Sequence, residues 1–315
     1  MKIVVIGGTG HIGSYLVPRL VRAGHEVVVL SRGNSKPYSS DVAWQSVRSV
    51  SVDREAQEKS GTFGLTIASF GSDVVIDLIC FTLNSAVQLA AALKDKVSQL
   101  LVCGTIWING ISEVVPFKEE HMRNPFGSYG IQKAEMTDFL LKEARQHRLP
   151  VTIVHPGHIV GKGWVPLNPQ GNFNLEIWKT IKAGKPLLLP NNGLETVHHV
   201  HADDVASVFI NAMHHWSAAV GEQFIAVSPQ AVTLNGYAQA AYRWFGHQPD
   251  LEFETWQRFS EKVSKEDAAA TWDHIHHSPC ASIEKATRLL EYVPRYSSFH
   301  AIEESVRYLE TIGKL

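Results

Sequence analysis

Residues 2–13 read Lys-Ile-Val-Val-Ile-Gly-Gly-Thr-Gly-His-Ile-Gly, and this stretch decides the fold. Its apolar first part, Lys2–Ile6, predicts a strand buried on both faces, and the apolar periodicity of Ile12–Ala23 predicts a helix directly after it. Glycine between the two permits a tight turn, brings backbone close to a bound phosphate and lets the helix pack against the strand. Because a helix amino terminus attracts anions, the stretch is typical of a site that binds the diphosphate of a dinucleotide.

The same alternation continues along the first half of the chain. Runs rich in Val, Ile and Leu predict further strands, and amphipathic stretches predict helices between them, at Glu26–Leu30, Asp73–Ile79, Ser85–Lys96, Gln99–Cys103, Tyr129–His147 and Val151–His155. Strands that are apolar throughout and alternate with helices indicate an α/β fold, a doubly wound parallel sheet of Rossmann type. We therefore expect residues 1–156 to form the dinucleotide-binding domain, and to carry the catalytic residues as well.

The second half of the chain has a different pattern. After Pro156, Gly, Pro and Asn interrupt short helical pieces, which indicates an irregular region over a substrate site. The elements expected here are a helix at Ala202–His214, a strand at Gln223–Val227 and helices at Leu234–Phe245, Ser282–Leu290 and Phe299–Ile312. Residues 157–315 are thus predicted to form a smaller, discontinuous substrate-binding lobe with segments that interleave with the first domain.

The composition bears on the kind of partner. The 315 residues carry 29 Lys and Arg against 31 Asp and Glu, a formal net charge of −2, with no long run of one sign. This balance lacks the basic footprint of a nucleic-acid or anionic-lipid binder, so we expect a small-molecule substrate, no nucleic acid and no membrane. The three cysteines are widely spaced, and the apolar run at the N-terminus is shorter than a signal peptide requires. The sequence predicts a soluble, cytoplasmic protein.

The end of the second strand bears on the choice of cofactor. It reads Val29-Leu30-Ser31-Arg32-Gly33, without the carboxylate that an NAD site places there to accept hydrogen bonds from the adenosine ribose. A guanidinium at this place can pair with a 2′-phosphate and stack on the adenine. Ser31 and Arg32 therefore favour NADP(H), with NAD(H) as the alternative if Arg32 is only a solvated surface charge.

A tyrosine and a lysine four residues apart, Tyr129 and Lys133, would share one face of the predicted helix. A free phenol has a pKa of about 10 and is a poor base at neutral pH. A neighbouring ammonium stabilises the phenolate, so the pair can exchange a proton with a substrate hydroxyl or carbonyl. This spacing indicates acid–base chemistry at a C–OH or C=O centre.

Several motifs, taken in order, resemble the extended short-chain dehydrogenase/reductase family, of the NAD-dependent epimerase/dehydratase type. The Gly-x-x-Gly-x-x-Gly spacing, the Tyr-x-x-x-Lys pair and residues 100–110 agree with that family's order. Residues 155–161 look like its Arg-Pro-Gly-Asn-x-Tyr-Gly segment, 199–206 like His-Val-Asp-Asp-Val-Ala, and 221–224 like the start of Gly-Glu-x-Phe-Asn. The resemblance covers essentially the whole chain.

The resemblance implies roles for single residues. Thr105, which precedes Tyr129 by 24 residues, stands where the family has the hydroxyl that bonds the substrate oxygen, so Thr105, Tyr129 and Lys133 form the implied catalytic group. The implied cofactor contacts are Gly7, Thr9, Gly10, His11, Ile12, Gly13, Ser31, Arg32, Asp53, Leu78, Ile79, Lys133, Pro156 and His158. A homodimer through the helices Ser85–Lys96 and Tyr129–His147 is also implied.

Two departures from the family narrow the reaction. Dehydratases of the family follow the catalytic hydroxyl with Asp-Glu, whereas this chain has Ile106 and Trp107, so elimination of water lacks its acid and base. Nucleotide-sugar epimerases carry an Asn and an Arg where this chain has His158 and Val197, and valine cannot neutralise a diphosphate. The cations left to do so from another direction are Lys162, Lys179 and Arg243.

Histidines and tryptophans suggest two further hypotheses. Histidines gather at 198–201 and 274–277, as in zinc sites, but hydride transfer with a Tyr–Lys pair needs no metal, so we expect none. Aromatic rings suit a sugar or aromatic substrate, and the tryptophans considered for such a pocket are Trp107, Trp164, Trp178 and Trp272. The pocket residues predicted are Trp107, His158 and Trp164.

These observations predict an NADP(H)-dependent oxidoreductase that interconverts a secondary alcohol and a ketone on a small substrate, with a sugar-like ring as one option. An epimerase of UDP-sugar type that retains its cofactor is the alternative within the family. A non-catalytic relative that senses dinucleotides or binds nucleic acid is the alternative of another class. The intact Thr105, Tyr129 and Lys133 argue against that last alternative.

Overall fold

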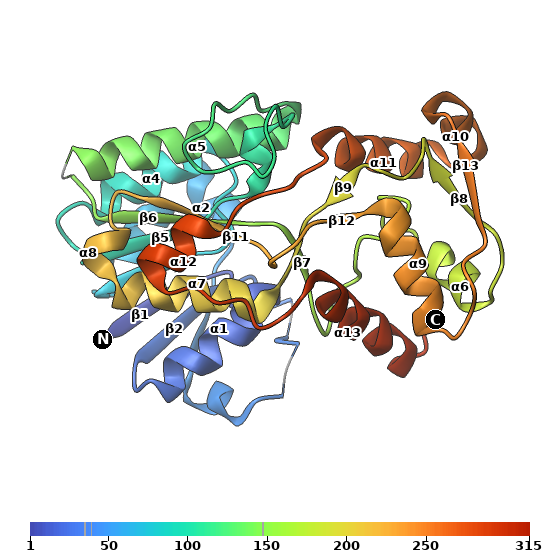
Figure 1. Ribbon diagram of the computed structural model, residues 1–315. Coiled ribbons are helices and arrows are strands. Elements are labelled where there is room, and N and C mark those ends of the chain that lie inside the picture. The colour runs from blue at the N-terminus through green and yellow to red at the C-terminus, as the bar shows by residue number, and fades with distance from the viewer. Residues whose placement is uncertain (35, 39, 147) are drawn as a thin grey trace.

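A parallel sheet of seven strands forms the centre of the larger part of the molecule, on the left in Figure 1. The computed structural model describes residues 1–34, 36–38, 40–146 and 148–315. In spatial order the strands are β11 (Gln223–Ala226), β6 (Val151–Pro156), β5 (Gln99–Cys103), β4 (Val74–Asp77), β1 (Lys2–Ile6), β2 (Glu26–Ser31) and β3 (Arg48–Ser51). All neighbouring pairs are parallel, and most of these strands are buried along their length. The predicted fold class, a doubly wound Rossmann-type sheet, is confirmed.

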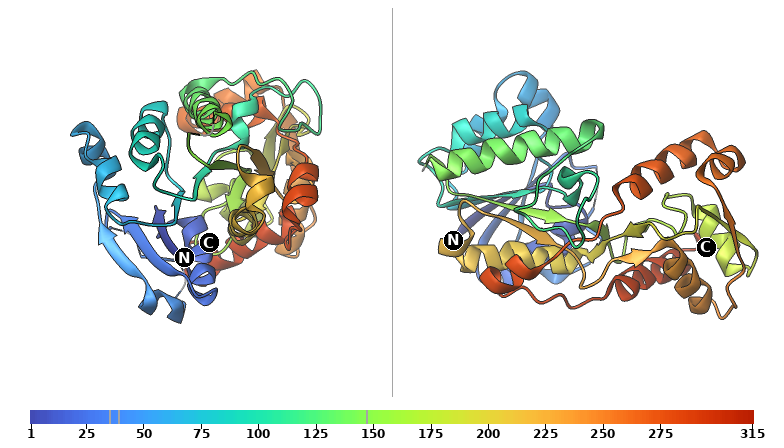
Figure 2. Two further views of the ribbon diagram at one scale, coloured as in Figure 1. Left: turned by 90° about the vertical axis from the view of Figure 1, so that its left-hand side faces the viewer. Right: turned by 45° about the horizontal axis from the view of Figure 1, so that its top comes forward.

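Helices cover both faces of the sheet. One face carries α1 (His11–Arg22), α7 (Ala202–His214) and α12 (Glu284–Leu290), and the other carries α3 (Phe63–Ala68), α4 (Leu83–Leu93) and α5 (Gly127–Arg145). Figures 1 and 2 show the sheet between these two layers. Each layer has its own apolar core, because a sheet buried on both faces needs one on each side. The helix predicted at Tyr129–His147 corresponds to α5, and His147 lies outside the described residues.

The strand order reverses between β1 and β4. From β1 the chain moves to β2 and β3 on one side, then crosses back to β4 and moves on to β5 and β6 on the other. The connections that follow β1 and β4 therefore diverge at this point. In open α/β sheets, ligands bind in the crevice outside the carboxyl ends of the strands where the order reverses. Gly7, after β1, and Ile79, after β4, both lie there, and a Cβ on Gly7 would be 2.7 Å from the Ile79 side chain.

A buried ion pair holds the carboxyl end of β4. The carboxylate of Asp77 is fully buried, accepts a hydrogen bond from the Ile79 N–H (3.0 Å) and pairs with Arg54 (2.9 Å). Arg54 begins α2 (Arg54–Lys59) and also binds Glu58 at 2.7 Å. The carboxylates raise the pKa of Arg54 against the effect of its burial. This network fixes the turn that follows β4 beside Gly7.

The second half of the chain builds a separate lobe, to one side of the sheet in Figure 1. Its larger elements are α6 (Leu175–Lys182), β8 (Leu187–Pro190), α9 (Leu234–Trp244), β13 (Leu251–Glu254), α10 (Trp256–Lys262), α11 (Lys265–His277) and α13 (Ser298–Thr311). Its core contains Trp178 and Tyr237, each 0% exposed. Trp178 is therefore a core residue, and the hypothesis that it lines a substrate pocket is wrong.

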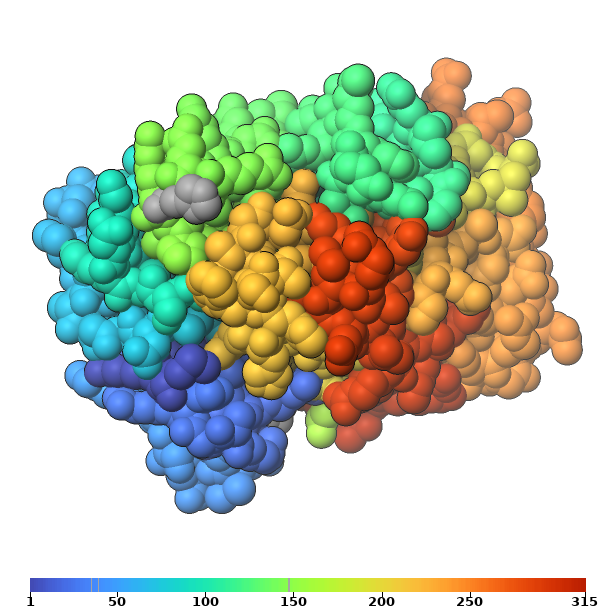
Figure 3. All heavy atoms as spheres, turned by 60° about the vertical axis from the view of Figure 1, so that its left-hand side comes forward, coloured from blue at the N-terminus to red at the C-terminus, as the bar shows by residue number. Residues whose placement is uncertain are grey.

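Parts of the second half return to the sheet. β11 pairs with β6, α7 packs against α1, and Figure 3 shows gold and red segments of the second half between blue and green segments of the first. The side chain of Glu119 caps the outer edge of β11, where its Oε1 accepts a hydrogen bond from the Ile225 N–H at 2.8 Å. In the described part of the chain, no helix combines the length and the apolar character needed to cross a membrane.

Candidate functional site

A cavity of about 230 Å³ lies where the carboxyl ends of β5 and β6 meet the second lobe. Its lining residues are Thr105, Ile106, Trp107, Tyr129, Gly157, His158, Ile159, Trp164, Leu167, Phe173 and His274. Five residues predicted as catalytic or pocket residues thus lie at one cavity, although they come from three separate segments. These five are Thr105, Trp107, Tyr129, His158 and Trp164.

The backbone of Thr105 is held by a histidine of the neighbouring strand. The Thr105 N–H donates to Nδ1 of His155 (3.1 Å), and Nε2 of His155 lies 3.0 Å from the Gln223 side-chain oxygen. Burial lowers the pKa of His155 to about 3, so the ring is neutral, accepts at Nδ1 and donates at Nε2. A Cβ on Gly104 would be 2.2 Å from Nδ1, so only glycine leaves room for this imidazole. His155 is a positioning residue that the sequence analysis did not assign.

The hydroxyl of Thr105 begins the short 3₁₀ helix η2 (Ile106–Asn109). Its Oγ1 accepts a hydrogen bond from the Trp107 N–H at 3.3 Å. Trp107 then lies edge-on to the Tyr129 ring, with the ring centres 6.0 Å apart. The backbone of Trp107 also lies close to Gly130 of α5, because a Cβ added to Gly130 would be 3.1 Å from the Trp107 carbonyl oxygen. This close packing holds the Thr105 hydroxyl beside the first turn of α5.

Tyr129 is a protonated phenol at neutral pH. Desolvation raises the pKa of Tyr129 to about 12, although a hydrogen bond with Thr105 acts in the opposite direction. The sequence analysis expected the Lys133 ammonium to stabilise the phenolate. Instead, Nζ of Lys133 donates to the Cys103 carbonyl oxygen at 2.7 Å and lies 5.9 Å from the centre of the Tyr129 ring. The phenol is therefore set to donate a proton.

Lys133 is nearly inaccessible, at 1% exposure. Its ammonium lies 4.9 Å from the centre of the Phe81 ring, a cation–π distance, and burial lowers the pKa of Lys133. The same face of α5 thus presents Lys133 to the end of β5 and Tyr129 to the cavity, as the four-residue spacing requires.

The residues of the first turn fit a dinucleotide diphosphate. α1 has no side-chain cap and no acidic residue in its first turn, so its leading N–H groups remain available to an anion. Gly7 has φ +79°, and a Cβ on Gly13 would be 2.1 Å from the Gly8 carbonyl oxygen. The predicted contacts Thr9, Gly10, His11 and Ile12 belong to this same turn.

The predicted contacts to the adenosine half lie at the ends of neighbouring strands. Ser31 ends β2 and Arg32 follows it as an exposed residue, while Leu78 and Ile79 follow β4. Asp53 caps α2, where its Oδ1 accepts a hydrogen bond from the Ala56 N–H at 3.0 Å. The capping bond accounts for Asp53 without a cofactor, and its contact with adenine stays a prediction.

One loop of the second lobe reaches the phosphate-binding turn. The Trp164 ring stacks on the His11 ring, with the centres 5.1 Å apart and the planes 12° apart. Tyr38, from the loop after β2, lies edge-on to both rings. Burial lowers the pKa of His11 to about 3, so this stack is uncharged. Trp164 therefore borders both the cavity and the predicted cofactor site.

A further wall of the cavity, in contact with Trp107, comes from α11 and the loop before α6. His274 of α11 has its ring centre 5.2 Å from Trp107, 4.8 Å from His158 and 5.5 Å from Phe173. No motif indicated His274 or Phe173 in advance. The only signal for His274 is the histidine cluster 274–277, which the sequence analysis considered as metal ligands rather than as a pocket wall, and Phe173 has no signal in the sequence.

A buried amide network fixes that wall. Asn168 and Asn172 are 0% and 1% exposed, and Oδ1 of Asn168 accepts a hydrogen bond from the Gln170 N–H at 2.9 Å. Nδ2 of Asn172 donates to Oγ1 of Thr271 on α11 at 3.1 Å, and Nδ2 of Asn174 donates to Oδ2 of Asp267 at 2.9 Å. The loop and α11 are thereby joined into one unit.

Other candidate features lie elsewhere. Among the described residues, no group of three His, Cys, Asp or Glu side chains is arranged to hold a metal ion. Trp272 is 41% exposed and stacks on His276, outside the cavity. The predicted cofactor contacts Pro156 and His158 lie in consecutive strands, β6 and β7 (His158–Val160), and of the two His158 lines the cavity.

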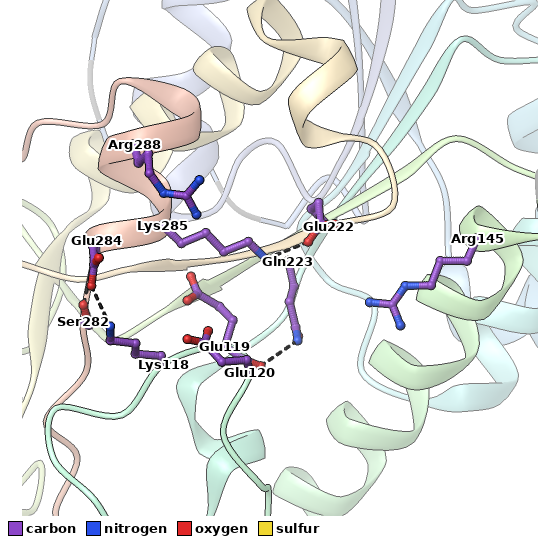
Figure 4. A pocket seen from close by; sticks show the side chains of 10 residues that line it. All are labelled: Lys118, Glu119, Glu120, Arg145, Glu222, Gln223, Ser282, Glu284, Lys285 and Arg288. Atoms are coloured by element: carbon purple, nitrogen blue, oxygen red, sulfur yellow. Dashed lines mark hydrogen bonds and ion pairs between the residues drawn. The ribbon is translucent and has the colours of Figure 1, made fainter.

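A larger cavity of about 320 Å³ shares no lining residue with the first (Figure 4). Its walls are mostly charged, and Lys118–Glu284 and Lys285–Glu222 form ion pairs of 2.7 Å across it. Arg145 and Arg288 lie on opposite sides of it in Figure 4 and do not converge on one point. None of the predicted site residues lines it, so the larger volume of this cavity does not identify it as the functional site.

Comparison with known proteins identifies the family. The model of the NAD dependent epimerase/dehydratase family matches residues 3–226, which include the phosphate-binding turn, Thr105, Tyr129, Lys133 and β11. The chain belongs to the NAD dependent epimerase/dehydratase family. The predicted recognition is confirmed, and the chain is a member of a family of NAD-dependent enzymes.

Two curated relatives differ in what they do. The chain is 27% identical over 314 residues to the chloroplast stem-loop binding protein of 41 kDa b of Arabidopsis thaliana, covering 96% of this chain and 78% of that protein. It is 27% identical over 208 residues to the 2′-dehydrokanamycin reductase of Streptomyces kanamyceticus, covering 66% of this chain and 56% of that protein.

Solved structures of the family share the fold. The dTDP-glucose 4,6-dehydratase of Bacillus anthracis, in complex with NAD, superposes with a TM-score of 0.76 at 18% identity, covering 100% of this chain and 98% of that one. The UDP-glucose 4-epimerase of Thermotoga maritima, with UDP-glucose, gives a TM-score of 0.74 at 18% identity and covers 99% of both chains. At this identity the likeness concerns the fold.

Proposed function

We propose that this family member is an NADP(H)-dependent oxidoreductase that interconverts a secondary alcohol and a ketone on a small, uncharged or sugar-like substrate. The observation that carries the proposal is the meeting of Thr105 and Tyr129 at one cavity, with Lys133 buried on the same face of α5. The resemblance to a 2′-dehydrokanamycin reductase over 66% of this chain supports a reductase among the family's activities.

The proposed chemistry is a single hydride transfer. NADP(H), when bound, supplies or accepts the hydride. In the reduction, the Thr105 and Tyr129 hydroxyls hydrogen-bond the carbonyl oxygen, and Tyr129, a phenol at neutral pH, gives its proton to the alkoxide that develops there. The hydrogen bond to the Cys103 carbonyl oxygen holds Lys133 in place, with its positive charge 5.9 Å from the centre of the Tyr129 ring.

Two residues of the cavity wall argue against elimination, and a residue outside the wall, Val197, argues against a diphosphate substrate. Ile106 is 3% exposed and Trp107 is an aromatic neighbour of Tyr129, so neither supplies the acid and base that loss of water requires. Val197, in β9 (Thr196–Val197), is 0% exposed and carries no charge for a diphosphate. These features support a reductase over a dehydratase or a nucleotide-sugar epimerase.

Stoichiometry tests the proposed function. Purified protein is mixed with NADPH and a panel of uncharged cyclic ketones, and the absorbance of NADPH is followed together with product by chromatography. We expect one NADPH to be consumed for each alcohol formed. Conversion of UDP-glucose into an isomer without loss of NADPH would instead establish the epimerase, and release of a 4-keto-6-deoxy sugar would establish a dehydratase.

The cofactor preference has its own test. Arg32 is exposed, and no ion pair engages it within the described residues, so its guanidinium is available to a 2′-phosphate. A charge-assisted contact of about 1.5–3 kcal/mol corresponds to about one to two orders of magnitude in affinity. We expect calorimetric titration to give tighter binding of NADPH than of NADH, and Arg32→Ala to remove the difference. Equal affinities in the unaltered protein would contradict the proposal.

We also propose a homodimer through α4 and α5. On α4, Val87 and Ala91 are exposed, with Phe81 just before the helix, and Ile131 is exposed on α5. Apolar side chains left open on two adjacent helices suit an isologous interface between copies. We expect light scattering at micromolar concentration to give twice the chain mass, and Val87→Lys with Ile131→Lys to give the monomer. A monomer in the unaltered protein would reject the interface.

The remaining proposals concern partner and compartment. The Arabidopsis relative is named for binding a stem-loop. For this chain we propose no nucleic-acid role, because its net charge is −2 and the cavity collects catalytic side chains. Cys80, Cys103 and Cys280 are free thiols, which supports the cytosol as its compartment.

A further inference from the structure

The cavity that holds Thr105 and Tyr129 has an uncharged lining. None of the described residues that line it is Asp, Glu, Lys or Arg. Its polar groups are the Thr105 and Tyr129 hydroxyls, which the proposed reduction uses, the indole N–H groups of Trp107 and Trp164, which can only donate, and the imidazoles of His158 and His274, which the reduction does not use. A group that lines the cavity and has no part in the reaction is available to recognise the rest of the substrate.

The hydrogen bonds of His274 fix which of its nitrogens carries the proton. Nδ1 lies 2.6 Å from the Ala270 carbonyl oxygen of the same helix. A carbonyl oxygen only accepts, so Nδ1 must carry the hydrogen. Burial lowers the pKa of His274 to about 4, which keeps the ring neutral. In the neutral ring Nε2, which is farther from the helix backbone, therefore carries the lone pair and can only accept. A backbone hydrogen bond with Gly171, like the one with Ala270, raises the pKa of the ring against the larger effect of burial.

The position of His274 is well defined. The residue is 6% exposed, its ring lies among Trp107, His158 and Phe173, and its helix is tied to the loop 168–174 by the bond between Asn172 and Thr271. A rigidly held acceptor among aromatic rings selects a hydroxyl donor on a compact ring, and a charged group would have no counter-ion there.

We propose that His274 is a specificity-determining residue whose Nε2 accepts a hydrogen bond from a hydroxyl of the substrate, so that the site selects an uncharged ring carrying a second hydroxyl beside the reacting C–OH or C=O carbon. This inference rests on the proposed function for the place of the reacting carbon, which lies at Thr105 and Tyr129. It adds the class of substrate, a neutral ring with two adjacent oxygen-bearing carbons, and names a residue of the second lobe that recognises the second hydroxyl.

Binding of two small probes tests the inference without relying on turnover. The protein saturated with NADP⁺ is titrated with trans-1,2-cyclohexanediol and with cyclohexanol, and the two Kd values are measured by ligand-observed NMR. A site built to bond a hydroxyl discriminates strongly against the analogue that lacks it. We expect the diol to bind at least about tenfold more tightly, a ratio that falls toward one in His274→Phe and is partly kept in His274→Gln, which retains an acceptor.

His276→Phe is the matched control, because His276 lies on the same helix but stacks on Trp272 and does not line the cavity. It should keep the preference of the unaltered protein. Equal Kd values for the two probes, no binding of either at tens of millimolar, or a preference unchanged in His274→Phe would overturn the inference.

A parallel assay separates this result from the proposed function. NADPH oxidation is followed with 2-hydroxycyclohexanone, cyclohexanone and 3-oxocyclohexane-1-carboxylate. Turnover of the first in preference to the other two supports both proposals. A binding preference that depends on His274, without turnover of any ketone, would sustain the inference and reject the reductase. Turnover with no effect of His274→Phe on the ratio of kcat/KM values would reject the inference alone.

Discussion

Tyr129→Phe is expected to lower turnover by about 10²–10⁴-fold, the usual contribution of a positioned proton donor. The phenol is the only group at the cavity with a dissociable proton close to the Thr105 hydroxyl among the described lining residues. Phenylalanine keeps the ring that packs edge-on to Trp107, so the cavity keeps its shape. The change should lower kcat and leave the affinity for NADPH, measured by fluorescence titration, nearly unaltered.

Lys133→Met provides the contrast. It removes the hydrogen bond to the Cys103 carbonyl oxygen and the buried ammonium, so both turnover and NADPH affinity should fall. Thr105→Val, which keeps the volume and removes the hydroxyl, should resemble Tyr129→Phe. Turnover near that of the unaltered protein in Tyr129→Phe would show that the proton comes from another group and that the chemistry is wrongly assigned to this fold.

Acid is expected to unfold the protein near pH 5. Five histidines are at least 93% buried, and burial lowers their pKa values from 6.5 to about 3 or 4: His11, His155, His198, His199 and His274. Between pH 6.5 and 4 the unfolded chain therefore binds more protons than the folded one, and the free energy of unfolding falls as the pH falls.

The expected loss of unfolding free energy in acid is large because the contributions of the five histidines add. Each histidine that stays neutral in the fold costs about 1.4 kcal/mol at pH 5.5 relative to neutral pH, so five cost about 7 kcal/mol. Domains have a total stability of about 5–15 kcal/mol. Urea titrations followed by circular dichroism at pH 7.5, 6.5 and 5.5 should show this loss, and a constant free energy of unfolding across the range would contradict the burial of these rings in neutral form.

Substituting one of these histidines should remove its contribution to the pH dependence of the free energy of unfolding. His199 is 0% exposed and neither ring nitrogen has a hydrogen-bond partner within the described residues, so His199→Leu removes a titrating group without breaking a bond. The free energy of unfolding of this variant should depend less on pH, by about 1.4 kcal/mol between pH 7.5 and 5.5. His300→Gln, which replaces a histidine at an exposed position, is the matched control for the loss of an imidazole.

Most of the sheet was predictable because each strand carries a local signal. A run of β-branched residues buried on both faces, followed by a glycine turn or a helix, identifies β1, β2, β4, β5 and β6 from the sequence alone. β3 is harder to find, because only Val50 among its four residues is apolar and the strand lies at the edge of the sheet. The strands β7, β8, β9, β10, β12 and β13 have two to four residues each, too few for a periodic pattern.

The candidate site divides in the same way. Thr105 and Tyr129 belong to motifs of fixed spacing, so their meeting at one cavity could be anticipated. His274 and Phe173 reach the cavity only through the packing of α11 against the loop 168–174, which depends on buried amides far apart in the sequence. The sequence also did not reveal that Lys133 donates to the Cys103 carbonyl oxygen rather than to the Tyr129 phenol. That hydrogen bond depends on three-dimensional packing.

The return of the second half to the sheet has a consequence for synthesis on the ribosome. When β6 (Val151–Pro156) has just left the exit tunnel, its outer edge has unpaired N–H and C=O groups, and β11 (Gln223–Ala226), which pairs with that edge, has still to be translated. Glu119, made earlier, is likewise without the Ile225 N–H that it binds in the finished fold. The nascent chain must therefore keep an open sheet edge from pairing with other chains while the intervening lobe emerges, an interval in which chaperone binding would protect it.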